Sequence, residues 1–281
     1  MNDGGLIELR SSHGSHEGAD YAFGRQSTVA RYDVAVRRLQ SSATCFFCRS
    51  LPAMPRITHY KTPCPEGVNS QILQMVVDYL TDISAVGLGP SNLLYNVYQY
   101  AVGYEVHLYL EALNGEKGTD VELLVATDED DPEQVIGFLL YLPVQGDWEA
   151  CSVAYMAVRE GHRRQGVARA MIGEMVGRYP HAELACTVGK VPYFEALGFE
   201  VIGQRETQVL MSTRHYRSNG LRGFIDTTPI YRSLEVQQIH TYLLQKNGKR
   251  AMLDAEKQRD RHLDQTSRHS EEFVRQRLTV H

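Results

Sequence analysis

The stretch Arg163-Arg164-Gln165-Gly166-Val167-Ala168 decides the fold, because it separates an apolar strand from an apolar helix. The run before it, Val153 to Val158, is short and continuously apolar, which is typical of a strand covered on both faces. The run after it, Val167 to Tyr179, carries apolar residues at helical spacing. The sequence therefore predicts a strand that turns through a loop of small residues into a helix.

Such a loop is a favourable place for an anion. The free backbone N–H groups of the first helical turn and the positive end of the helix point at one spot. A pyrophosphate suits this geometry well, and small residues such as Gly166 and Ala168 let a phosphate approach the backbone. A nucleotide P-loop is excluded because no Gly-Lys-Ser/Thr follows, and the three-glycine spacing of a dinucleotide fingerprint is absent.

Two motifs, in order along the chain, carry a resemblance to a known family. The string V-R-E-G-H-R-R-Q-G-V-A-R-A-M resembles the acyl-CoA loop of the GNAT N-acetyltransferases, whose pattern is Gln/Arg-x-x-Gly-x-Gly/Ala, although Glu160 stands where a Pro is common. Downstream, P-Y-F-E-A-L-G-F at Pro192 to Phe199 resembles the last helix of that family and its Gly-Phe exit into a strand. The alternative interpretation of these residues is an ordinary strand–turn–helix. The resemblance implies an α/β fold, with the α+β mixed sheet of an acyl-CoA N-acyltransferase.

The resemblance also implies a co-substrate, acetyl-CoA, and the residues that bind it. The loop amides and neighbouring guanidinium groups would hold the pyrophosphate, and the strand before the loop would pair its free backbone groups with the pantetheine arm. The implied cofactor-binding residues are Met156, Ala157, Val158, Arg163, Arg164, Gln165, Gly166, Val167, Ala168 and Arg169.

The proton donor for the departing CoA sulfur is less well matched. In the family a Tyr usually lies four residues before the Gly of the Gly-Phe pair, and counting back from Gly198 gives Phe194. Tyr193 is one residue earlier, a rotation of about 100° on a helix. We expect Tyr193 to act as the catalytic acid through a shifted helix; a water molecule in its place, or a weakly active domain, are the alternatives. Phe194 is expected to pack in the core.

A general base is also uncertain from sequence. Family members often place a Glu on the strand before the loop, where this chain has Cys151-Ser152-Val153. Glu149 and Glu183 are candidates that would act through water, and an acceptor amine that arrives neutral would need no base. Cys151 and Cys186 are expected to be buried inert thiols, and His107 and His162 are expected to be structural or solvent-facing imidazoles.

Charge indicates the kind of acceptor. Between Glu66 and Thr213 the sequence has 21 acidic and 8 basic residues, a net charge of −13, whereas both ends of the chain are basic. An acidic catalytic domain attracts cations and repels nucleic acid. The sequence therefore predicts transfer to a primary amine of a small cationic molecule or a protein, with nucleic acid disfavoured. Asp78, Asp82 and Glu105 are candidate charges on the amine side.

Domain organisation follows the change in composition along the 281 residues. We expect a poorly ordered or artefactual N-terminal extension at 1–65, a GNAT domain at 66–216 and a charged helical extension at 217–281. Met54 is a candidate natural start. A zinc site is a minor alternative for a group of soft ligands in this region, namely Cys45, Cys48, His59 and Cys64.

Within these limits the hydrophobic pattern predicts individual elements. They are helices around 72–83 and from Ser91, strands at Glu105–Leu110, Val121–Ala126, Val135–Leu142 and Glu183–Val188, a helix at Val191–Leu197, and a strand pair at Glu200–Met211. Helical spacing returns after residue 234, with Asn247-Gly248 as a break. This last helix either packs on the domain or forms a dimerisation or partner-binding arm.

No apolar run approaches the length of a membrane span, the N-terminus lacks a secretory signal, and five cysteines are too few for a disulfide framework. The expected location is the cytoplasm, with no membrane association and with a homodimer as one possible state. The alternative function is a catalytically weak acyl-CoA-binding interaction protein whose C-terminal arm contacts a partner.

Overall fold

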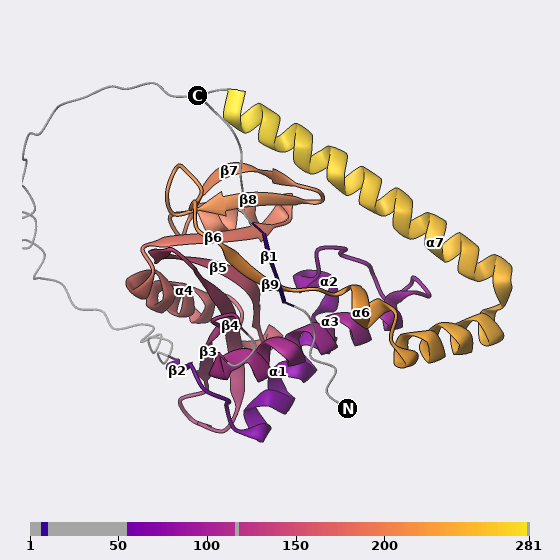
Figure 1. Cartoon of the computed structure of the whole chain (residues 1–281), viewed down its shortest axis with the longest axis horizontal. Helices are drawn as coiled ribbons and strands as arrows, with labels where there is room; N and C mark the ends of the chain where they lie inside the picture. Colours follow the sequence, from indigo (N-terminus) through magenta and orange to yellow (C-terminus); the bar gives the residue numbers. More distant parts are fainter. Residues whose placement is uncertain (1–6, 11–54, 116–117, 280–281) are drawn as a thin grey trace, which may run out of the picture. The chain divides into compact units, whose positions relative to one another are not determined.

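The computed structural model describes residues 7–10, 55–115 and 118–279. A mixed sheet of seven strands is its central element (Figure 1). In spatial order the strands are β2 (Arg56–Tyr60), β3 (Glu122–Thr127), β4 (Val135–Val144), β5 (Asp147–Val158), β6 (His181–Cys186), β8 (Gln208–Ser212) and β7 (Glu200–Arg205). All neighbours pair antiparallel except β5 and β6, which are parallel. A separate two-stranded sheet joins β1 (Ile7–Arg10) to β9 (Arg222–Ile225).

Helices cover both faces of the sheet. One face packs against α1 (Glu66–Asp78) and α3 (Tyr95–Glu111), and the other packs against α4 (Val167–Arg178) and α5 (Val191–Glu195). The remaining helices are α2 (Leu80–Ile83), α6 (Thr228–Tyr231) and α7 (Leu234–Thr279). The mixed sheet with helices on both faces confirms the predicted fold class.

Strand β3 shows why this sequence forms a doubly covered sheet. All six of its residues are buried. Leu123 and Val125 belong to the cluster under α1 and α3, whereas Leu124 and Ala126 belong to the cluster under α4. Because alternate side chains of a strand point to opposite faces, a continuous apolar run is needed wherever both faces are covered.

The strand predicted at Glu105–Leu110 is wrong: these residues are the last turns of α3. The sequence E-V-H-L-Y-L alternates polar and apolar residues, which favours a strand. The helix forms because Val102, Val106 and Tyr109 follow at helical spacing and are all buried in the core. Tertiary packing therefore overrides the local pattern, and Glu105 lies on a helix.

The sheet also begins earlier than the predicted domain boundary at residue 66, because β2 pairs with β3 along its full length. The carboxylate of Glu122 on β3 adds side-chain contacts to this pairing. It accepts hydrogen bonds from His59 Nε2 (2.8 Å) and from the hydroxyls of Tyr141 (2.8 Å) and Tyr179 (2.7 Å), and it lies 2.7 Å from Lys61 Nζ. Residues 56–60 are thus part of the domain, not of an extension.

This cluster predicts a loss of stability in acid. Burial by itself raises the pKa of Glu122, but the hydrogen bonds from its four neighbours outweigh burial and hold the pKa below the ordinary 4.5. A carboxyl whose pKa is lower in the folded state stabilises the fold above its unfolded pKa. We expect the free energy of unfolding, measured with urea at a series of pH values, to fall as the pH drops through this lowered pKa. Glu122→Gln should flatten that decline, and an unchanged slope would contradict the assignment.

Two of the residues considered for a zinc site have other partners. His59 binds Glu122, and Cys64 Sγ donates to Asn69 Oδ1 at 2.6 Å. Cys45, Cys48 and Met54 lie outside the described residues. Within the described ranges, no set of three or more His, Cys, Asp or Glu side chains is placed to hold a metal ion, and no helix is long and apolar enough to cross a membrane.

The C-terminal helix packs back on the domain. The break predicted at Asn247-Gly248 is present as a kink, with Gly248 at φ 81°. Beyond it, Asn92 Nδ2 donates to the Ala255 carbonyl at 3.0 Å, and Ser270 Oγ donates to the Glu206 carbonyl at 3.0 Å. Val274 is buried in the core cluster under α4. The helix is therefore attached to the domain at several points along its length.

Candidate active site

The centre of the sheet opens between two strands. Strands β5 and β6 pair in parallel only from Ala150 to Ser152 opposite His181 to Glu183. Beyond Ser152 they separate, and both line a cavity of about 610 Å³. Because β5 continues to Val158 without a partner strand on this side, backbone N–H and C=O groups there are available to a ligand, apart from the Val158 carbonyl, which accepts from Arg163 Nε.

The predicted anion-binding loop lies at this cavity. Gly166 is the N-cap of α4 with φ 88°, and Arg164 has φ 64°, so the backbone turns sharply into the helix. A Cβ at Gly166 would meet no atom within 4 Å, so the space in front of the loop is open. The first-turn amides of α4 have no partners within the helix. The loop can therefore receive an anion from the cavity side.

Positive side chains surround the same opening. Three contacts hold the Arg163 guanidinium in place. Its Nη2 lies 3.1 Å from Asp82 Oδ2, and its Nε donates to the Val158 carbonyl at 3.1 Å. Its central carbon lies 4.7 Å from the centre of the Tyr79 ring. Lys190 Nζ donates to the Asp82 carbonyl, and burial lowers the pKa of its ammonium. Four cationic side chains line the cavity, namely Arg163, Arg164, Arg169 and Lys190.

Most of the predicted cofactor residues come together here. Those that line the cavity are Met156, Ala157, Val158, Arg163, Arg164, Gly166, Val167, Ala168 and Arg169. Gln165 is not among the lining residues, and its side chain donates to the Gly161 carbonyl at 2.9 Å. Lys190 was not predicted from the sequence. The one sequence feature that could have indicated it is its position two residues before the motif at Pro192 to Phe199.

Tyr193 lines the cavity from α5, and its side chain is 44% exposed. Burial raises the pKa of its hydroxyl and nearby Arg169 opposes that shift, so the group is protonated at neutral pH and can donate a proton. Phe194 is 7% exposed and stacks edge-on against Phe199, with the ring centroids 5.9 Å apart. The expectation that Phe194 packs in the core is confirmed.

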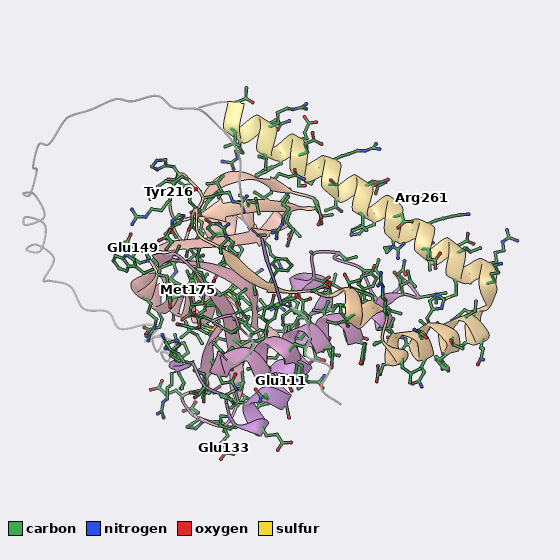
Figure 2. All side chains as sticks on the ribbon, in the orientation of Figure 1. Glu111, Glu133, Glu149, Met175, Tyr216 and Arg261 are labelled. Atoms are coloured by element: carbon green, nitrogen blue, oxygen red, sulfur yellow. The ribbon has the colours of Figure 1, made fainter. Side chains whose placement is uncertain are left out.

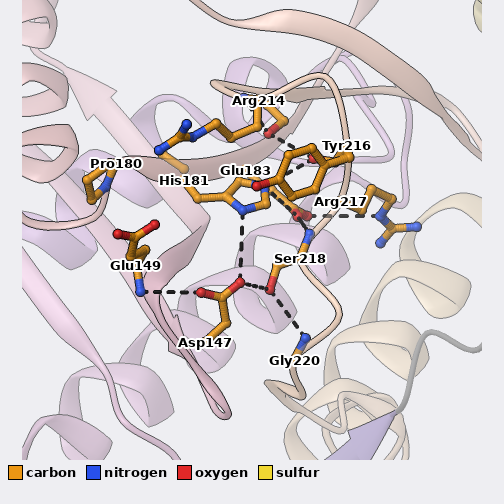
Figure 3. A network of polar contacts seen from close by, with 12 residues as sticks. Asp147, Glu149, Pro180, His181, Glu183, Arg214, Tyr216, Arg217, Ser218 and Gly220 are labelled. Carbon is orange, nitrogen blue, oxygen red and sulfur yellow. Dashed lines mark hydrogen bonds and ion pairs between the residues drawn. The ribbon is translucent and has the colours of Figure 1, made fainter. Parts of the chain in front are cut away.

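The two carboxylates considered as general bases lie elsewhere. Glu149 is near the start of β5, two residues after Asp147 (Figures 2 and 3). It is not among the residues that line the cavity. Glu183 is buried and accepts a hydrogen bond from the Ser218 backbone N–H at 2.6 Å (Figure 3). It also accepts from Arg222 Nη2 at 2.6 Å. His181 Nε2 is 3.5 Å from it. Neither carboxylate is placed to meet a substrate in the cavity.

The thiols are buried, and the two imidazoles lie at the surface and at the cavity. Cys151 and Cys186 are buried, and burial raises the pKa of the Cys186 thiol to about 12, so this thiol remains protonated. His107 forms a surface ion pair with Glu111 on α3. His162 lines the cavity, with Nε2 3.0 Å from Asp128 Oδ2.

A family model described as an acetyltransferase (GNAT) domain matches residues 119–201, the segment that contains β3 to β6, the loop, α4 and α5. Among solved structures, the chain is similar to the PaiA N-acetyltransferase from Thermoplasma acidophilum in complex with coenzyme A, with 10% identity, coverage of 57% of this chain and 99% of that chain, and a TM-score of 0.44. It is similar to an aminoglycoside 6′-acetyltransferase type Ii, with 14% identity, coverage of 58% and 99%, and a TM-score of 0.42. Nourseothricin acetyltransferase gives 21% identity, coverage of 33% and 64%, and a TM-score of 0.30, so the match spans less than two thirds of that protein. No curated protein sequence matches the chain.

Proposed function

We propose that this chain, which carries a GNAT acetyltransferase domain, transfers an acetyl group from acetyl-CoA to a primary amine of a small cationic molecule or a protein. One observation carries the proposal: a single cavity is lined by the separated strands β5 and β6, by the loop before α4 and by Tyr193. An extended ligand with an anionic end and a reactive thioester end needs an anion-binding loop, an open strand edge and a proton donor in one cavity.

The residues present fit acetyl-CoA. When bound, acetyl-CoA supplies an acyl group activated as a thioester. The amides of Gly166 to Arg169 would hold the pyrophosphate at the positive end of α4. Arg163, Arg164 and Lys190 add charge at the same opening, and the free backbone edge of β5 from Met156 to Val158 would orient the pantetheine arm.

Tyr193 is proposed as the acid that protonates the departing sulfur. Because its hydroxyl remains protonated at neutral pH, we expect Tyr193→Phe to lower kcat by about 100-fold, the lower end of the effect of a positioned general acid. The affinity for CoA should stay within a factor of about two, since the phosphate-binding loop is untouched. Steady-state kinetics and calorimetry measure the two quantities. Tyr242→Phe, on the exposed face of α7, is the matched control, and an unchanged kcat in Tyr193→Phe would leave water as the donor.

The acceptor is proposed from charge. The net charge of −13 between Glu66 and Thr213 favours cationic amines over nucleic acid. We propose a cytoplasmic location, which the free thiols of Cys64, Cys151 and Cys186 support.

The experiment that tests the function has two parts. Calorimetric titration with acetyl-CoA measures binding, and a thiol-release assay over a panel of polyamines, aminoglycosides and lysine peptides measures transfer. Binding together with release on at least one cationic amine is the expected result. Absence of any CoA binding would overturn the proposal. Binding without release on any amine would favour the alternative of an acyl-CoA-binding interaction protein.

A further inference from the structure

We propose that Tyr155 and Glu105 together take the proton from the acceptor amine: Tyr155 is the catalytic residue that meets the amine, and Glu105 is a positioning residue that acts through it. This inference rests on the proposed function and assigns the base that the sequence left open.

A β-bulge places Tyr155 on the required side of the sheet. In the β4–β5 ladder Leu140 pairs with Tyr155 but Tyr141 pairs with Val153, so Ala154 is the extra residue. Regular alternation would put Val153 and Tyr155 on the same face. Instead Val153 packs on the α4 side, whereas Ala154 and Tyr155 pack on the α1 and α3 side. The bulge lies just past Ser152, where β5 leaves β6, and Tyr155 lines the cavity there.

Glu105 reaches Tyr155 from α3. Its carboxyl lies within hydrogen-bonding reach of the Tyr155 hydroxyl. The ring of Tyr109, one helical turn further along α3, is 6.4 Å from the ring of Tyr155, and the Tyr109 hydroxyl accepts from the Ile225 backbone N–H at 3.1 Å. These contacts hold the Tyr155 side chain, so a tyrosine that lines the cavity is backed by the Glu105 carboxyl of α3.

Burial gives this carboxyl the right proton affinity. Desolvation raises the pKa of Glu105 from 4.5 to about 7, and the hydrogen bond from Tyr155 opposes the shift. Two other tyrosines face the pair, Tyr109 from α3 and Tyr231 from α6, and Tyr98 of α3 and Arg259 of α7 lie beyond Tyr231. Burial and the negative charge of Glu105 also raise the pKa of Tyr155, so Tyr155 passes a proton on and does not hold a negative charge.

The proton transfer balances. The amine nitrogen donates its lone pair to the C–N bond as the thioester C–S bond breaks. The Tyr155 oxygen takes one proton from the nitrogen while the Tyr155 proton moves to Glu105. The departing sulfur takes a proton from Tyr193 or from water. Glu105 then releases its proton to solvent and the pair returns to its starting state, while Tyr193, where it has been the donor, takes a proton back from solvent.

The first test needs no turnover. Carbon-13 NMR of the full chain follows the Glu105 carboxyl through a pH titration, with the signal assigned by its loss in Glu105→Gln. We expect a pKa near 7 in the wild type and a higher value in Tyr155→Phe, because that variant removes the hydrogen bond that lowers it. Tyr104→Phe, an exposed tyrosine on the same helix, should leave the titration unchanged. A Glu105 carboxyl that titrates near 4.5, or that ignores Tyr155→Phe, overturns the pairing whatever the activity.

The second test uses the pH dependence of kcat with two acceptors of different amine pKa. In the wild type kcat should fall as the pH drops through about 7, at the same pH for both acceptors, because Glu105 must be ionised to accept the proton. Glu105→Gln and Tyr155→Phe should each lower kcat by about 100-fold. Glu105→Gln should also remove that inflection. Glu111→Gln on the exposed part of α3 is the matched control.

Thermal unfolding and CoA titration verify that each variant is folded and loaded. Wild-type kcat with unchanged pH dependence in Glu105→Gln overturns the inference while the proposed function stands. A wild type that turns over no amine overturns the proposed function, and the NMR titration still decides whether the pair exists.

Discussion

Gly166→Glu is expected to abolish binding of acetyl-CoA. Gly166 has φ 88°, a conformation that costs a residue with a Cβ about 1–2 kcal/mol, and the space in front of it is open. A Glu side chain there would fill the space where we propose that the pyrophosphate binds, and its negative charge would repel the phosphates. The loss should exceed about 100-fold in Kd, measured by calorimetry, since both the steric and the electrostatic terms oppose the phosphate.

Gly173→Glu is the matched control for this variant. It adds the same side chain to the same helix, at an exposed position with no positive φ and no atom within 4 Å of a Cβ. Because it lies almost two turns from the N-terminus of α4, its charge does not face the loop, and CoA affinity should change by less than about threefold. Equal losses in both variants would mean that net charge, not the loop, governs binding.

Glu183→Ala is expected to produce a large loss of stability. Glu183 is buried, and its carboxylate accepts a hydrogen bond from the Ser218 backbone N–H at 2.6 Å (Figure 3). Arg222 Nη2 donates to both oxygens of this carboxylate, at 2.7 and 2.6 Å. Removing it leaves the Arg222 guanidinium, 17% exposed, without its counter-ion. Breaking a buried pair in this way costs about 3–5 kcal/mol, which urea unfolding measures as a lower free energy of unfolding.

Glu149→Ala provides the comparison. Glu149 lies close to the same network, but its backbone N–H donates to Asp147 Oδ1, and the substitution keeps this hydrogen bond. Its cost should stay within about 0.5 kcal/mol. A small effect of Glu183→Ala together with lost turnover would instead return Glu183 to the list of candidate bases.

The parts of the site that could be predicted from the sequence are those with short-range signals. The loop Arg163–Ala168 can be recognised from sequence, because a glycine and small residues lie directly between two apolar runs, one a strand and the other a helix. Tyr193 could be named for the same reason, since its distance from Gly198 is fixed by one short helix.

The rest depends on contacts that are distant in sequence. The sequence around Glu105 alternates polar and apolar residues, as a strand does. These residues form a helix because α3 packs against the sheet. The bulge at Ala154, which turns Tyr155 toward α3, is set by the register with β4 and has no signature in the β5 sequence. Arg222 and Glu183 are 39 residues apart, and no pattern along the chain relates them.

In the proposed function, the open edge of β5 and the amides at the start of α4 bind acyl-CoA. Backbone amide NMR of the full chain during titration with CoA tests it most directly. We predict that the largest chemical-shift changes fall on Gly166, Val167 and Ala168 and on Met156 to Val158, and that they saturate together. Saturable binding whose shifts lie elsewhere, or no shift at the loop at any CoA concentration, would contradict it.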